Sequence, residues 1–146
     1  MVFEFMRSNR SIPNAAVIPE LAYIDVAAAA RWLCEHFGFQ ERLRIADHRV
    51  QLAIGEGAMV VTHCESAPAD IDQAHSVLVR VENVDAHYAK AVSKGVRIVQ
   101  PIKSHPYGER QYAAVDLGGH VWRFSQTMDD VDPASWGGIL IQQPQK

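Results

Sequence analysis

An internal repeat constrains the fold of this chain more than any other feature. Residues 19–39, PELAYIDVAAAARWLCEHFGF, align with residues 76–96, SVLVRVENVDAHYAKAVSKGV, at a constant offset of 57 that pairs Gly38 with Gly95. Each copy reads as a short apolar strand, an N-cap residue (Asp25 or Asn83), a helix of about three turns, and a glycine suited to a helix end. The sequence therefore predicts one structural unit used twice.

Three strand-like runs follow each glycine. They are residues 41–47, 49–55 and 58–64 in the first copy, and 97–102, 110–116 and 120–126 in the second. The unit is therefore βαβββ, and the predicted fold class is α+β with tandem modules. We expect an N-terminal arm (1–17), a first module (18–64), a polar linker (65–74), a second module (75–126) and a C-terminal tail (127–146). The alternative is an α+β chain with this element order by coincidence, because identities between the copies are few.

Composition and charge narrow the classes of partner that this chain is expected to bind. The 146 residues are 48% apolar, which suits a globular core, and the formal net charge is −3 without a basic stripe. Such a chain lacks the electrostatic footprint of a nucleic-acid or anionic-membrane binder. No apolar run approaches the ~20 residues of a membrane span, and the first residues do not form the apolar run of a signal peptide. Cys34 and Cys64 have no metal-ligand spacing, so we expect a reduced, cytoplasmic protein.

The second copy ends in residues 106–126, PYGERQYAAVDLGGHVWRFSQ. This segment resembles the aromatic-Gly-X-Arg…Asp-X-X-Gly-His-X-Trp ending of glyoxalase/bleomycin-resistance-like proteins. With the tandem βαβββ order, residues 18–126 resemble the vicinal oxygen chelate superfamily, which includes glyoxalase I, extradiol dioxygenases and bleomycin-resistance proteins. The resemblance implies a cup-shaped mixed sheet formed by both modules, a ligand inside the cup, and a homodimer. Open sheet edges, which leave backbone groups unpaired, also favour a homodimer.

The resemblance also implies where a metal would bind. Metal-dependent members carry one ligand on the first and one on the last strand of each module, and these positions here are Pro19, Val61, Ser76 and Arg123. Proline and valine offer no ligating atom, and arginine brings a positive charge without a lone pair. The sequence therefore predicts no metal or other cofactor, and it assigns no catalytic residue. A histidine/carboxylate metal cluster elsewhere stays an alternative.

Strand alternation predicts which side chains face the cup. The expected ligand-binding residues are Leu21, Tyr23, Met59, His63, Ser76, Leu78, Arg80, Val121 and Arg123. A mainly apolar concave surface with a few polar groups is typical of a small-molecule site, and two guanidiniums favour an anionic or aromatic ligand. In the alternative, both arginines pair with protein carboxylates or reach solvent at the rim.

These observations favour a protein that sequesters or carries a small organic molecule without metal. An enzyme is the main alternative: a lyase, isomerase or dioxygenase that uses a metal or acid–base chemistry by His63 and Tyr23. A third alternative is a partner-binding module. Trp136 and residues 139–141 are too apolar to extend freely into water, so we expect the tail to cover the cup or a dimer edge.

Overall fold

The computed structural model describes residues 9–15, 17–66 and 76–140. Most of the predicted linker therefore lies outside the described residues. The first module comprises β1 (Glu20–Tyr23), α1 (Val26–Phe37), β2 (Gln40–Ile45), β3 (Arg49–Ile54) and β4 (Gly57–His63). The second comprises β5 (Val77–Arg80), α2 (Val84–Ser93), β6 (Arg97–Ser104), β7 (Glu109–Val115) and β8 (Val121–Thr127), and η1 (Pro133–Trp136) follows. The predicted α+β fold with two βαβββ modules is confirmed.

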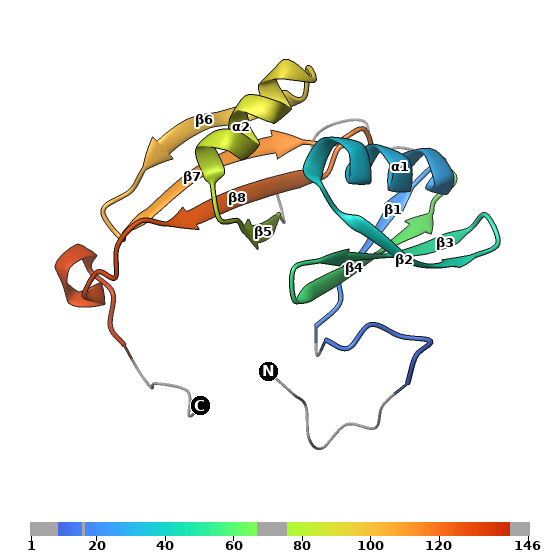
Figure 1. The fold of residues 1–146 in the computed structure, drawn as a ribbon, viewed down its shortest axis with the longest axis horizontal. Coiled ribbons are helices and arrows are strands. Elements are labelled where there is room, and N and C mark those ends of the chain that lie inside the picture. Colours follow the sequence, from blue (N-terminus) through green and yellow to red (C-terminus); the bar gives the residue numbers. More distant parts are fainter. Residues whose placement is uncertain (1–8, 16, 67–75, 141–146) are drawn as a thin grey trace.

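Each module forms its own four-stranded sheet with the same topology. The strand orders are β1-β4-β3-β2 and β5-β8-β7-β6. The first and last strands of each module pair in parallel, and the other neighbours pair antiparallel. Figure 1 shows each helix on one side of its sheet, so each sheet has one face turned away from its helix. We call these two surfaces the helix-free faces.

Matching caps define the two helices. Asp25 Oδ1 accepts a hydrogen bond from the Ala28 amide at 3.0 Å, and Asn83 Oδ1 accepts one from the Ala86 amide at 3.0 Å. Gly38 follows α1 with φ 79°, and Gly95 follows α2 with φ 74°. A positive φ of this size favours glycine because it has no Cβ. The capping residues read from the sequence are therefore confirmed.

One aromatic cluster joins the two modules into a common core. The ring of Phe37, at the end of α1, lies 5.9 Å from Trp122 and 5.0 Å from Phe124, both on β8. Trp122 and Phe124 are fully buried, as is Leu33 of α1. Aromatic pairs at these separations add to the stabilisation that burial provides. The two helices also contact each other, so the modules pack through their helical layer.

The predicted face assignment is wrong in the first module. Leu21, Tyr23, Met59 and Val61 belong to the core packed under α1, with at most 6% of each side chain exposed. The reason is an unequal helix length. The N-caps are 58 residues apart (83 − 25), whereas the C-terminal glycines are 57 apart (95 − 38). If the offset of 57 is also used for the strand before the helix, that strand is aligned one residue out of place. A shift of one residue assigns every side chain of the strand to the wrong face.

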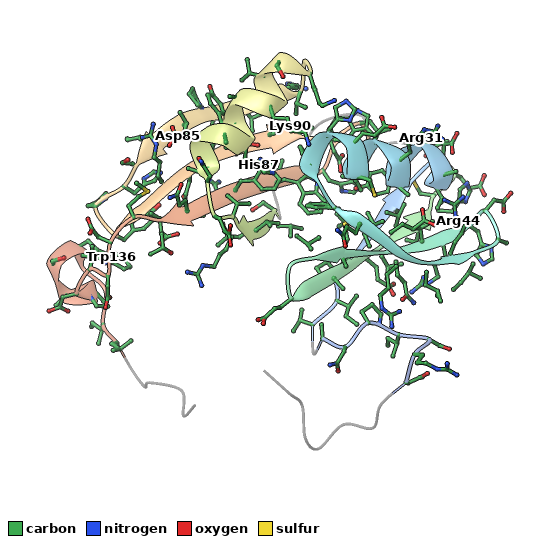
Figure 2. The ribbon with its side chains drawn as sticks, in the orientation of Figure 1. Arg31, Arg44, Asp85, His87, Lys90 and Trp136 are labelled. Carbon is green, nitrogen blue, oxygen red and sulfur yellow. The ribbon has the colours of Figure 1, made fainter. Side chains whose placement is uncertain are left out.

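The described part of the tail packs against the turn between β6 and β7. The Met128 amide donates to the Gly108 carbonyl at 2.8 Å, and the ring of Trp136 lies 5.3 Å from that of Tyr107. Figure 2 labels Trp136 beyond the end of the second sheet. Ile139 remains 83% exposed. Among the described helices, none is long and apolar enough to cross a membrane.

His87 links α2 to both the second sheet and α1. Its Nδ1 lies within hydrogen-bond distance of the Tyr112 hydroxyl, and its Nε2 lies 3.3 Å from the Phe37 carbonyl oxygen. Burial lowers the pKa of His87, and the charge of nearby Lys90 (Figure 2) adds to this, while the Phe37 carbonyl acts in the opposite direction. The folded chain therefore favours the neutral imidazole.

We expect acid to destabilise the fold through His87. Below its ordinary pKa of about 6.5, the imidazole binds protons more readily in the unfolded chain than in the folded one. The free energy of unfolding should therefore fall as pH drops from 7 through 6, and His87→Gln should remove that part of the slope. Urea unfolding at several pH values measures it. His48→Gln, on an exposed turn, is the control; an equal slope in both variants would contradict the assignment.

Candidate functional site

Asp116 fixes the junction between the modules. Its buried carboxylate accepts hydrogen bonds from the Tyr23 hydroxyl at 2.6 Å, the Trp122 indole at 2.9 Å, and the amides of Gly118 and His120 at 2.9 and 3.0 Å. Burial raises the pKa of the Tyr23 phenol far above its ordinary value, and the charge and hydrogen bond of Asp116 add to the rise. Tyr23 therefore stays protonated and acts as a donor to Asp116.

This junction changes the roles that the sequence suggested for the first module. Tyr23, Leu21 and Met59 do not line the cup, because they pack in the core. His63 does reach solvent, at the end of β4. The proposed acid–base pair of Tyr23 and His63 is not supported, since the Tyr23 hydroxyl already donates to Asp116.

In the second module, the predicted alternation holds. Trp122 and Phe124 lie in the core, while Leu78 and Arg80 are exposed and Arg123 and Val121 are half-buried. Ser76, just before β5, is also exposed. The role of these residues in binding stays a prediction. What the structure adds is their arrangement in rows across the sheet.

Two rows of side chains cross the helix-free face of the second sheet. Strand pairing places Leu78, Arg123, Ala113 and Gln100 in one row, and Arg80, Ser125, Gln111 and Lys103 in the next. Ala113 is buried yet lies outside the core cluster, which fits a small apolar floor on this second face. The face therefore carries three cationic side chains, Arg80, Arg123 and Lys103, beside a buried centre of Ala113, Ser125 and Gln111.

A chain of hydrogen bonds runs along the second row. The Tyr107 hydroxyl donates to Gln111 Oε1 at 3.3 Å, Gln111 Nε2 donates to Ser125 Oγ at 3.0 Å, and the Ser125 hydroxyl donates to Glu109 Oε1 at 2.6 Å. Gln111 and Ser125 are buried. All three bonds point the same way and end on a carboxylate, so they hold the side chains of this face in fixed positions.

The two arginines have neutral partners among the described residues. Arg80 Nη2 donates to the Thr127 hydroxyl at 2.9 Å, and Arg123 Nη1 donates to Gln100 Oε1. The ion pairs within the described chain join other residues: Arg44 with Glu41, Arg49 with Glu20, and Arg110 with Asp85. Among the described residues, therefore, protein carboxylates do not neutralise both arginines, as one alternative had expected. Arg80 does reach solvent.

A pocket of about 470 Å³ lies where the two modules meet beside β5. Leu78 and Arg80 line one side, and the turn between β3 and β4, together with Pro19, lines the other. Small-molecule sites commonly have volumes of about 300–1,000 Å³. Arg80, Glu82 and Thr127 help to line a second hollow of about 350 Å³. Arg80 borders both.

The helix-free face of the first sheet is covered by the chain itself. Residues 9–13, which we call the strap, cross it and place the Pro13 side chain in a buried position. Gln51 and Val60 face the strap side and are 4% and 3% exposed, although neither belongs to the core under α1. Figure 1 shows the strap on the side of this sheet opposite α1. The two halves of the cup are therefore not equivalent.

The expected metal positions do not fit a divalent cation. With the corrected offset of 58, the counterpart of Ser76 in the first module is Ile18, and strand pairing makes Val60 the counterpart of Arg123. Ile18 and Val60 are aliphatic, as are Pro19 and Val61 at the positions expected first. Across residues 9–15, 17–66 and 76–140, no group of three His, Cys, Asp or Glu side chains is placed to hold a metal ion.

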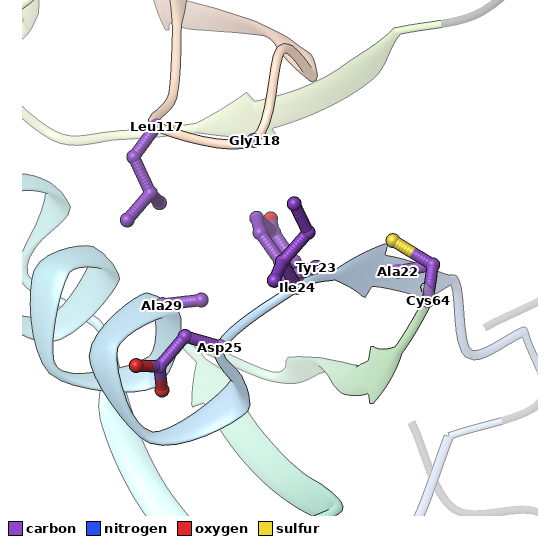
Figure 3. Close-up of a pocket in the computed structure, with 8 residues that line it drawn as sticks. All are labelled: Ala22, Tyr23, Ile24, Asp25, Ala29, Cys64, Leu117 and Gly118. Atoms are coloured by element: carbon purple, nitrogen blue, oxygen red, sulfur yellow. The ribbon is translucent and has the colours of Figure 1, made fainter. Parts of the chain in front are cut away.

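A smaller cavity of about 160 Å³ lies at the junction itself (Figure 3). It is lined by Ala22, Tyr23, Ile24, Asp25, Ala29, Cys64, Leu117 and Gly118. Gly118 approaches the Tyr23 ring so closely that an added Cβ would lie 2.8 Å from Tyr23 Cε2. Asp25, the one charged residue, already caps α1. This cavity therefore offers apolar surface and few polar groups.

Two βαβββ modules in tandem, each with its helix on one side of a four-stranded sheet, define the class of fold. Residues 16–124 match the profile described as the Glyoxalase/Bleomycin resistance protein/Dioxygenase superfamily. The structure of TioX from Micromonospora sp. ML1 is similar, with 34% identity, a TM-score of 0.66, and coverage of 77% of this chain and 98% of TioX. The chain belongs to this superfamily.

More distant structures share the fold. A glyoxalase/bleomycin resistance protein/dioxygenase from Alicyclobacillus acidocaldarius is 13% identical, with a TM-score of 0.66 and coverage of 81% of this chain and 95% of that one. The fosfomycin resistance protein FosX from Listeria monocytogenes is 14% identical, with a TM-score of 0.64 and coverage of 77% and 92%. At these identities the likeness concerns the fold alone. Among curated proteins, none matches this chain.

Sequence reasoning missed Glu109, Gln111, Gln100 and the strap. Glu109, Arg110 and Gln111 are three consecutive polar residues, so alternation does not indicate which of them share a face. Gln100 lies beside an irregularity in the pairing of β6 with β7, which breaks simple alternation. The strap contacts had no comparable signal, because they involve backbone carbonyls.

Proposed function

We propose that this chain binds a small organic acid on the helix-free face of the second sheet, without metal, and serves to sequester or carry it. The observation that supports this most is the pair Arg80 and Arg123, whose described partners are neutral. Charged groups in a partly enclosed surface are stabilised by a counter-charge. An anionic group on the ligand would supply it.

The ligand would combine this anion with an apolar or aromatic body. Leu78 is 58% exposed and neighbours both arginines on the same face, since it pairs with Arg123 and lies two residues before Arg80. The hydrogen-bonded row from Tyr107 to Glu109 would hold the floor rigid. The homodimer that open sheet edges predict belongs to the same proposal. So does the reduced cytoplasmic setting, which agrees with Cys34 and Cys64 being free thiols.

We expect Arg123→Met to weaken the binding of acids. A hydrogen bond to a charged group contributes about 1.5–3 kcal/mol, so the dissociation constant for an aromatic acid should rise about tenfold or more. Calorimetric titration with aromatic carboxylic acids and their neutral amides measures this. The amides should bind weakly to both proteins.

The matched control is Arg31→Met, which removes an exposed guanidinium from α1 (Figure 2). It should leave acid binding unchanged. Equal affinity for acids and amides, or equal losses in the two variants, would overturn the proposed function. Elemental analysis of protein purified without chelator tests the enzyme alternative, because a stoichiometric transition metal would support it.

A further inference from the structure

The strap is held by side chains that recognise its backbone. Arg42 Nη2 donates to the Arg10 carbonyl at 3.0 Å, and Gln51 Nε2 donates to the Ser11 carbonyl at 2.9 Å. Arg42 Nη1 also donates to Gln51 Oε1 at 2.6 Å, which fixes the two donors side by side. The helix-free face of the first sheet therefore presents a pair of donors for two neighbouring carbonyl oxygens.

Beyond the packing of Pro13, the described residues provide few other contacts that hold the strap. Of its five residues only Pro13 is buried, and Ile12 is 51% exposed. The amides of Ser11 and Ile12 bond to Asn9 within the strap itself, not to the sheet. Arg42 is exposed to solvent, so its hydrogen bond competes with water. A strap held in this way can be displaced.

The donors occupy a place related to the proposed anion site. Gln51 pairs with Val60 across β3 and β4, and Val60 is the counterpart of Arg123, which pairs with Ala113 across β7 and β8. Each half of the cup thus carries hydrogen-bond donors near its centre. In the second half the Arg123 donor meets a side chain of the same sheet, Gln100, whereas in the first half the donors meet backbone carbonyls of the strap.

We propose that Arg42 and Gln51 form a second subsite of the cup, which takes carbonyl oxygens of the ligand, and that the strap occupies this subsite in the free chain. The proposal rests on the proposed function because it concerns the same cup. A ligand with amide, ester or ketone carbonyls at the spacing of neighbouring peptide groups would displace the strap. Its acidic group would meet Arg80 and Arg123.

Hydrogen exchange of the full chain, followed by mass spectrometry of the segment 9–15, tests this proposal. The probe is the capped peptide acetyl-NRSIPN-amide, which carries the strap's own carbonyls without charged termini. In the unaltered chain we expect exchange slower than that of the free peptide. Adding the probe in excess should accelerate exchange, because the probe takes the place of the strap.

Variants at the donors give a second readout. Arg42→Met should accelerate exchange of the segment about threefold or more without any probe, since it removes a hydrogen bond that water only partly replaces. Gln51→Leu should act in the same direction. Arg44→Met is the matched control, because Arg44 lies on the same strand and pairs with Glu41, not with the strap.

Three results would each overturn the proposal: exchange of the segment at the free-peptide rate in the unaltered chain, no acceleration by Arg42→Met beyond that of Arg44→Met, or no response to saturating probe. None of these measurements involves Arg123 or an acidic ligand. The two proposals can therefore be told apart. Acid binding can be unaffected by Arg123→Met while the strap is displaced by the probe, and acid binding can be weakened while the strap is not displaced.

Discussion

Replacing Asp116 with alanine is expected to lower the free energy of unfolding by about 3–5 kcal/mol. The carboxylate accepts four hydrogen bonds, from two side chains and two backbone amides, and three of these donors belong to the second module itself. Alanine would leave the buried Tyr23 hydroxyl and Trp122 indole without their acceptor. Urea unfolding followed by tryptophan fluorescence measures the change.

The control for this effect is Asp47→Ala, which removes a carboxylate from an exposed turn between β2 and β3. Surface substitutions of this kind usually change stability by less than about 0.5 kcal/mol. Tyr23→Phe removes one donor and keeps the ring, so it should cost less than Asp116→Ala. A loss below about 1 kcal/mol for Asp116→Ala would show that the junction does not depend on this carboxylate.

The second large effect is expected at Gly108. Its φ of 87° lies in the left-handed region, and an added Cβ would lie 2.9 Å from Val131 Cγ2 and closer still to the Asp129 carbonyl oxygen. Backbone strain and overpacking each cost about 1–3 kcal/mol, so Gly108→Ala should destabilise the fold by roughly 2–4 kcal/mol or release the tail. Because Trp136 packs on Tyr107, a released tail would change tryptophan fluorescence.

Gly55→Ala separates the two causes. Gly55 also has a positive φ, of 57°, but an added Cβ there would meet nothing within 4 Å. This variant therefore carries the backbone strain without the clash. If Gly108→Ala costs no more than Gly55→Ala in urea unfolding, the contact between the tail and the β6–β7 turn is not tight in solution.

Local signals in the sequence predicted the elements well, whereas the assignment of faces failed in the first module. Asp25, Asn83, Gly38 and Gly95 have capping roles that depend on neighbouring backbone alone, and all four are found in those roles. The run Ala58–Val61 is apolar throughout, so the alternation of polar and apolar residues did not indicate which of its faces is buried. The caps themselves, 58 residues apart, held the information that corrects the face.

Only part of the candidate site could be predicted from the sequence. Arg80 and Arg123 interrupt strands whose other face is apolar, so their side could be read directly from the pattern. Asp116 was visible as a turn residue, but its four donors come together only in the folded chain. The strap contacts depend on Arg42 and Gln51 meeting carbonyl groups, which every residue carries.

The parallel pairing of first and last strands has a consequence for synthesis of the chain. β1 finds its partner β4 only after α1, β2 and β3 have emerged, and β5 waits for β8 in the same way. Even a finished first module leaves Phe37 without the β8 rings that cover it. During synthesis from the N-terminus, the nascent chain would therefore expose an aromatic surface until β8 has emerged. Such surfaces favour aggregation or chaperone binding.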